Sequence, residues 1–186
     1  MSHMHSSKNG LLNKDDSILV LIDMQERLVP VISEKEKVLE NVVKLIRFSH
    51  IIGIPVVLTE QQKLGPTHPE IRKELMGVRP IPKIEFDCFG SNAFREHIDQ
   101  INRNSLIIAG IEAHICVAQT AVHAVSDYTA HVVSDAIASR SPKNVTVALQ
   151  RMQQCGVTIT STEMVMYELM GKAGTDTFRE VLHLVK

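Results

Sequence analysis

Hydrophobic residues follow two alternating patterns along this chain. Short, unbroken apolar runs such as Ser17–Ile22 and Ser105–Ala109 are typical of strands that are buried on both faces of a parallel sheet. Longer segments such as Glu34–Ile52 place apolar residues on one face of a helix, with lysines and glutamates opposite. Because the two patterns alternate, the sequence predicts an α/β fold whose parallel sheet is covered by helices on both faces.

Glycine, proline and capping residues set the expected limits of these elements. The expected strands are Ser17–Ile22, Ile54–Thr59, Arg79–Ile84, Asn104–Ala109, Ala130–Val133 and Val157–Thr160. The expected helices are Glu34–Ile52, a short one ending at Leu75, one capped by Ser91 and ending near Ile101, Ile115–Tyr128, one from Ser141 to about Cys155, Thr162–Met170 capped by Ser161, and Thr175–Val185.

Length and composition narrow the possible partners. The 186 residues suit one domain, and 44% hydrophobic with 22% charged residues is ordinary for a soluble globular protein. A formal net charge of −1 gives no electrostatic case for nucleic acid or an anionic membrane as a partner. No apolar run reaches the ~18–20 residues that a membrane span needs.

The start of the chain is expected to lie outside the fold. Residues 1–14 lack the apolar core of a signal peptide, and we interpret them as a flexible N-terminus or an expression tag, with the domain at 15–186. His3 and His5 therefore carry little weight as ligands. Three cysteines without close pairing argue against a secreted disulfide scaffold and for a reducing cytoplasm.

Three chemically reactive residues occur where predicted strands end. Asp23 follows the first strand, Lys83 ends the third, and Cys116 follows the fourth at the start of a helix. Because the carboxyl ends of parallel strands share one edge of the sheet, these side chains should meet in one crevice. A cysteine at a helix start is also close to free amides and to the positive end of the helix dipole, which favour thiolate.

Each of these residues has an ordinary structural explanation when taken alone. An aspartate after a strand often forms a turn, a lysine beside prolines is usually a solvated edge charge, and a lone cysteine is more often a small core residue. Their joint placement at one edge favours nucleophilic acyl transfer, in which cysteine attacks a carbonyl, a base takes its proton and backbone amides hold the oxyanion.

Three motifs carry a resemblance to a known family: Leu21–Gln25, Lys83 before Phe86, and Gly110–Val117. Together they resemble the isochorismatase-like cysteine hydrolases over roughly Ser17 to Met170. The segments most similar to isochorismatase domain-containing proteins are Thr59–Gln61, Leu64–His68, Gly110–His114 and Ser139–Ser141. The resemblance implies a Rossmann-like, three-layer α/β/α sandwich with a six-stranded parallel sheet, which assembles as a homo-oligomer.

The same resemblance implies a catalytic triad of Asp23, Lys83 and Cys116. It implies a cis peptide bond without proline at Ile111–Glu112, and an oxyanion hole made by the backbone amides of Glu112 and Cys116. The expected reaction is hydrolysis of a small amide or related C–N bond through a thioester acyl-enzyme. The identity of this small-molecule substrate does not follow from the sequence.

The side chains expected to contact the substrate are Gln25, Gln61, Phe86, Ile111 and His114. His114 and Glu112 have an alternative role, in which they line the turn and hydrogen-bond to backbone. Phe86 and Phe89 either wall the pocket or pack beneath it.

The chain departs from the nicotinamidases of this family, which bind a metal through an Asp-x-His pair after the second strand. Here that stretch is Thr59–Gln62 and has no histidine, although His68 follows in the next loop. A zinc site needs three or four convergent ligands, so we expect no metal and no cofactor. Isochorismate hydrolysis in the family can proceed without the cysteine, so Cys116 favours an amide-type substrate.

Other functions remain open at this point. A catalytically idle oligomeric scaffold or binding protein would use Met164, Met166 and Met170 as an interface instead of as core. A reactive-cysteine redox protein is a third possibility, with Cys88 either forming a regulatory disulfide with Cys116 or being a spare buried thiol. Cys155 is expected in the core. A dinucleotide site is excluded because no Gly-x-Gly-x-x-Gly follows the first strand.

Overall fold

The computed structural model describes residues 10–185, and residues 1–9 and 186 lie outside this range. Six parallel strands form one sheet in the order β3-β2-β1-β4-β5-β6, an order typical of Rossmann folds. The strands are β1 Ser17–Ile22, β2 Val56–Gln61, β3 Ile81–Lys83, β4 Ser105–Ile111, β5 Thr129–Ala138 and β6 Thr158–Thr160.

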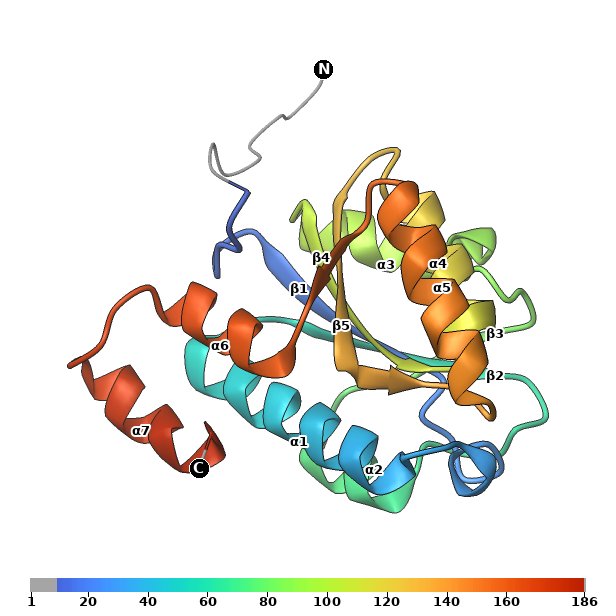
Figure 1. Ribbon diagram of the computed structural model, residues 1–186, viewed down its shortest axis with the longest axis horizontal. Coiled ribbons are helices and arrows are strands. Elements are labelled where there is room, and N and C mark those ends of the chain that lie inside the picture. Colours follow the sequence, from blue (N-terminus) through green and yellow to red (C-terminus); the bar gives the residue numbers. More distant parts are fainter. Residues whose placement is uncertain (1–9, 186) are drawn as a thin grey trace.

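Helices cover both faces of this sheet, as predicted (Figure 1). One layer is formed by α1 Lys35–Ile52, α2 Pro69–Glu74, α6 Thr162–Met170 and α7 Asp176–Val185. The other layer is formed by α3 Asn92–Ile101, α4 Ala118–Ala124 and α5 Pro142–Gln154. The short helices η1 Val29–Val31 and η2 Cys88–Gly90 lie in loops, and a π-helical turn, η3 Ala113–Val117, precedes α4. None of the helices within residues 10–185 is long and apolar enough to cross a membrane.

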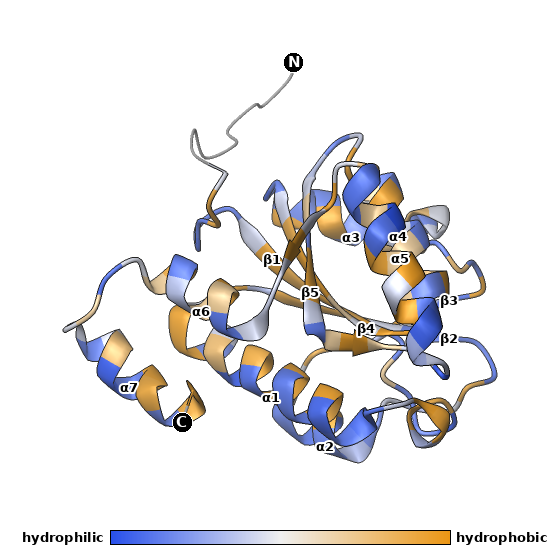
Figure 2. Ribbon diagram, in the orientation of Figure 1, coloured by the Kyte–Doolittle hydropathy of each residue, from blue (hydrophilic) through white to orange (hydrophobic). Residues whose placement is uncertain are grey.

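The continuous apolar run of β1 is explained by two separate hydrophobic cores. Leu19 and Leu21 belong to the core beneath α1, whereas Ile18, Val20 and Ile22 belong to the core beneath α4. Successive strand residues point to opposite faces of the sheet, so a strand in the middle of a sandwich must be apolar on both. The central strands are accordingly the hydrophobic band between the two helix layers (Figure 2).

Several predicted elements differ in extent from the observed ones: β2 is shifted to Val56–Gln61, β3 is limited to Ile81–Lys83 and β4 continues to Ile111. The polar residues Ser134 and Asp135 were expected to end the fifth strand, but β5 continues to Ala138. The strand tolerates them because the Ser134 hydroxyl donates to the carbonyl of Thr160 at 2.9 Å, and Asp135 accepts from the backbone amide of Thr162 at 2.8 Å. The helix predicted from Ile115 begins instead as the π-helical turn η3.

Several single residues also differ from expectation. Cys155 is exposed and does not lie in the core, because it follows the last turn of α5. Ser91 makes no side-chain capping bond. The methionine group does not form one surface, since Met166 is fully buried while Met164 is exposed. The core also starts earlier than the expected domain boundary, because Leu12 is buried and its amide donates to Glu168.

Gly110 of β4 is paired with Ile22 of β1. Its φ is 129°, and a Cβ there would be 2.2 Å from the backbone oxygen of Ile22. Backbone on the central strand cannot move aside without disturbing the ladder on both of its edges. Only glycine therefore fits at the end of β4, directly before the turn that carries Cys116.

We predict that Gly110→Ala lowers the free energy of unfolding by at least about 3 kcal/mol, because positive-φ strain of about 1–3 kcal/mol adds to the clash. Gly156→Ala is the matched control: Gly156 has φ of 92°, and a Cβ there would meet only open space. The Gly156→Ala variant should therefore lose only the free energy of unfolding that the positive-φ strain costs. Urea unfolding followed by circular dichroism measures both, and equal losses would contradict the close approach.

Candidate active site

Strand register brings the predicted residues together at the carboxyl edge of the sheet. Ile22 is paired with Thr59 of β2 on one side and with Gly110 of β4 on the other. Gln61 of β2 is paired with Lys83 of β3. Asp23, directly after β1, therefore lies beside the ends of both neighbouring strands, and its backbone takes a left-handed conformation with φ of 54°. The Lys83 ammonium reaches across to it, with Nζ 2.7 Å from Asp23 Oδ2.

The Asp23–Lys83 pair is removed from solvent. The side chains are 1% and 0% exposed, respectively. Charges at such a position are stable only if further hydrogen bonds replace the lost water. Thr59 Oγ1 donates to Asp23 Oδ1 at 2.8 Å, and Lys83 Nζ donates to Gln61 Oε1 at 2.7 Å and to the Glu85 carbonyl at 3.3 Å. Both carboxylate oxygens are thus occupied, and so are the three donor positions of the ammonium.

The Cys116 thiol adjoins this pair and is 7% exposed. Burial raises the pKa of Cys116 well above its usual range, and the charge of Asp23 raises it further while Lys83 lowers it. For Lys83, burial lowers the pKa, but the charges of Asp23, Cys88 and Cys116 outweigh it and the net shift is upward. The resting arrangement is therefore a neutral thiol beside a carboxylate–ammonium pair.

Cys88 lies in the same buried environment. Burial raises its pKa to about 12, against a lowering influence of Lys83 and of a hydrogen bond to Thr120. The Cys88 backbone amide also donates to Thr120 Oγ1 of α4 at 3.0 Å, which fixes the loop after β3 to the helix that follows Cys116. All three cysteines of the chain are free thiols. Cys88 is therefore a buried free thiol, the second of the two alternatives given for it.

Gln25 and Gln61 form a clamp between the loops after β1 and β2. Gln25 Nε2 donates to the carbonyl oxygens of Gln61 and Gly65, and its Oε1 accepts from the Gln61 amide at 2.8 Å. Gln61 Nε2 donates to the Ile84 carbonyl at 2.8 Å. These side chains support the loops that hold Lys83, and their predicted contact with substrate is untested.

The turn before Cys116 is anchored to the loop after β5. Its peptide bond Ile111–Glu112 is cis. The buried Glu112 carboxylate accepts from the Arg140 amide at 3.2 Å and pairs with the Arg140 guanidinium. His114 Nδ1 lies 2.9 Å from Ser139 Oγ, and its Nε2 lies 3.2 Å from Asn144 Nδ2. Glu112 thus takes the alternative role of hydrogen bonding to backbone, whereas the partners of His114 are the side chains of Ser139 and Asn144.

The other predicted contact residues differ in exposure. Phe86 is 55% exposed, whereas Ile111 is buried. Phe89 is buried and packs against Phe94 with ring centroids 5.1 Å apart, so it lies beneath the loop. His68 caps α2 by accepting from the Glu70 amide. Within residues 10–185, no group of three or more His, Cys, Asp or Glu residues is arranged to hold a metal ion.

Thr59 is the member of the site that residue patterns did not single out. It is fully buried and hydrogen-bonded to Asp23. One signal was available, because a hydroxyl at the carboxyl end of an otherwise apolar strand points to the same edge as Asp23 and Lys83. Threonine is common in strands, however, and this made the signal weak.

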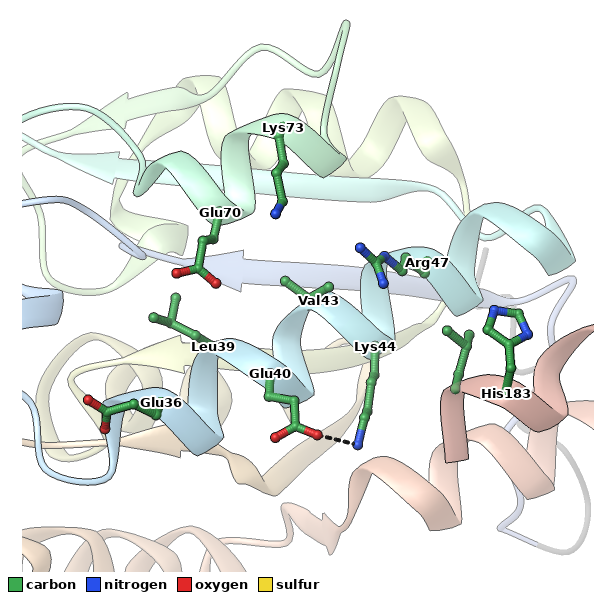
Figure 3. A pocket seen from close by; sticks show the side chains of 10 residues that line it. Glu36, Leu39, Glu40, Val43, Lys44, Arg47, Glu70, Lys73 and His183 are labelled. Carbon is green, nitrogen blue, oxygen red and sulfur yellow. Dashed lines mark ion pairs between the residues drawn. The ribbon is translucent and has the colours of Figure 1, made fainter. Parts of the chain in front are cut away.

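A groove of about 460 Å³ lies on the opposite helix layer (Figure 3). It is lined by α1, α2 and α7, with Leu39 and Val43 between the charged residues Glu40, Lys44 and Arg47. These elements pack on the other face of the sheet from Cys116. The groove is therefore separate from the candidate active site.

We predict that Lys83→Met lowers the free energy of unfolding by about 3–5 kcal/mol, because it leaves the Asp23 carboxylate buried without a cation. The double variant Asp23→Asn/Lys83→Met should recover part of this loss. Arg47→Met is the control, since Arg47 pairs with Glu74 with its side chain 49% exposed, and its loss should cost less than about 1 kcal/mol. Urea unfolding at neutral pH gives all three values, and a Lys83→Met loss no larger than the control would contradict a buried ion pair.

Comparison with known proteins gives a consistent assignment. The isochorismatase domain model matches residues 17–164. Isochorismatase domain-containing protein 2 of Danio rerio is 35% identical over 179 residues, which cover 95% of this chain and 90% of the relative. The Homo sapiens protein of that name is 34% identical over 182 residues, or 95% of this chain and 86% of the relative.

Solved structures of other proteins have the same fold as this chain. The MAR1 ribonuclease from Caenorhabditis elegans has a TM-score of 0.88 and 29% identity, covering 94% of this chain and 92% of that one. The YcaC gene product of Escherichia coli is described as an octameric hydrolase of unknown specificity. It has a TM-score of 0.87 and 23% identity, covering 94% of this chain and 90% of that one. The latter identity supports the fold alone. With its sheet order, its matched domain and these relatives, the chain belongs to the isochorismatase family of hydrolases.

Proposed function

We propose that this protein is a cysteine-dependent hydrolase that cleaves a small amide or related C–N bond through a thioester on Cys116. The observation that carries the proposal is the buried Asp23–Lys83 pair, 2.7 Å apart, beside the thiol at the carboxyl edge of the sheet. A buried ion pair is costly, and ionisable groups in such surroundings are concentrated at functional sites.

The raised pKa of Cys116 is compatible with a nucleophile. That pKa describes loss of the proton to water, which would add a negative charge to a buried site. Transfer of the same proton to Asp23 leaves the net charge of the cluster unchanged. Lys83 then pairs with the thiolate in place of the carboxylate. The internal transfer therefore avoids most of the desolvation cost that opposes ionisation to solvent.

The proposed reaction runs in two halves. Asp23 takes the Cys116 proton, the thiolate attacks the acyl carbon, and the oxyanion is held by the backbone amides of Glu112 and Cys116. The tetrahedral intermediate collapses, and the leaving amine takes the proton from Asp23. Water then gives a proton to Asp23 and attacks the thioester, and the departing thiolate recovers that proton. Gln25, Gln61, Phe86, Ile111 and His114 are the residues proposed to surround the substrate.

We also propose that the protein acts as a homo-oligomer in a reducing cytoplasm. Ile84 and Phe86, on either side of Glu85 in the loop after β3, are 62% and 55% exposed. Two large apolar side chains at the rim of a site suit coverage by substrate or by a second copy. The three free thiols suit a reducing compartment.

The test uses p-nitrophenyl acetate and a panel of small amides with the purified protein. We expect an acetyl adduct on the peptide that contains Cys116, and hydrolysis that Cys116→Ala abolishes without changing the circular dichroism spectrum. Cys155→Ala is the matched control, because Cys155 is exposed at the end of α5 and is not part of the cluster, and it should retain full activity.

Hydrolysis that survives in Cys116→Ala would overturn the proposal. A reactive Cys116 without turnover of any amide or ester would favour the scaffold or redox function instead. RNA serves as a further substrate in the same assay, because one similar structure is that of a protein described as a ribonuclease. Cleavage of RNA that does not depend on Cys116 would assign a different activity to the chain.

A further inference from the structure

One polar group in the cluster has no part in the proposed reaction. The Thr59 hydroxyl donates to Asp23 Oδ1 at 2.8 Å, while Lys83 donates to the other oxygen, Oδ2, at 2.7 Å. Thr59 and Asp23 are both fully buried. Water therefore cannot replace the hydroxyl at Oδ1 without a rearrangement of β2.

Strand pairing fixes this hydroxyl in place. Thr59 is paired with Ile22, the residue directly before Asp23, and with Ile81 of β3. Its backbone is thus held from both sides of β2. A β-branched side chain has few accessible rotamers in a strand, so the Oγ1 position is well defined. The hydrogen bond is accordingly set by the sheet and not by a mobile loop.

We propose, as a consequence of the proposed function, that Thr59 is a positioning residue which holds Asp23 in the orientation and charge state that accept the Cys116 proton. The charged and titratable groups that face Asp23 come from separate elements: Lys83 on β3, Cys116 on η3 and Cys88 on η2. Thr59 is the neutral donor among them. It stabilises the carboxylate without adding a charge that would compete for the thiolate.

The consequence is a pH threshold for the reactivity of Cys116. A hydrogen bond to the ionised carboxylate favours the charged form, which alone can accept the thiol proton. Without this bond the charged carboxylate loses its neutral donor and its fixed orientation, and the thiol has a base over a narrower range of pH. The threshold should therefore rise when the hydroxyl is removed and stay constant when it is kept.

The experiment measures the rate of Cys116 alkylation by iodoacetamide against pH, with mass spectrometry of the labelled peptide. The midpoint is the pH at which the labelling rate falls to half of its maximum on the acid side of the profile. In Thr59→Val we expect this midpoint to rise by about one to two pH units. Thr59→Ser keeps the donor and should retain the midpoint of the unaltered protein. Thr59→Ala, which lacks the donor but fills less space, should shift as Thr59→Val does.

Thr160→Val is the matched control. Thr160 is also a buried threonine at the end of a strand, but its Oγ1 has no hydrogen-bond partner among the described residues. Its replacement changes the same atoms without touching Asp23. Any shift common to both valine variants would reflect the loss of a buried hydroxyl in general.

The inference is overturned if Thr59→Val or Thr59→Ala folds and keeps its midpoint, or if Thr59→Ser shifts as far as they do. A lower labelling rate at an unchanged midpoint would assign a purely structural role to Thr59. Failure of the proposed function looks different, since the unaltered protein would then hydrolyse no amide or ester through Cys116, whatever the labelling midpoints of the Thr59 variants.

Discussion

The buried pair of Asp23 and Lys83 is the constraint on which the site depends. An aspartate and a lysine without solvent are stable only together, and only with hydrogen bonds at their remaining positions. Thr59, Gln61 and the Glu85 carbonyl supply those bonds. The loops after three strands are consequently joined through one ion pair. Cys116 lies against it on η3, after a fourth strand, and its protonation depends on the same two charges.

The fold provides this arrangement by keeping the ends of the central strands rigid. Gly110 allows β4 to run so close to β1 that no side chain fits between them. The turn beyond it is then tied to the loop after β5 through Glu112 and Arg140. On the other side, the Gln25–Gln61 clamp connects the loops after β1 and β2. The segment that carries Cys116 is thereby held from both directions, which is the kind of preorganisation that the proposed reaction would use.

Much of this could be predicted because the relevant signals are local. Two-sided burial makes each central strand a continuous apolar run, and amphipathic spacing marks α1, so the α/β class follows from periodicity. The positions of Asp23, Lys83 and Cys116 at strand ends also follow, because parallel strands share one edge. The predicted fifth strand was too short because its true length depends on contacts with residues far along the chain. Ser134 and Asp135 look like a turn until the partners at Thr160 and Thr162 are known.

The sequence by itself determined the family, the sheet with its two helix layers, and the three residues of the cluster. These depend on residue type and spacing, which persist in the unfolded chain. The tertiary structure decided which groups each charge contacts: that Thr59 occupies the second carboxylate oxygen, that Gln61 accepts from Lys83, and that Cys155 is exposed while Cys88 is buried. Those facts depend on strand register and on packing between segments far apart in the chain, which no local pattern specifies.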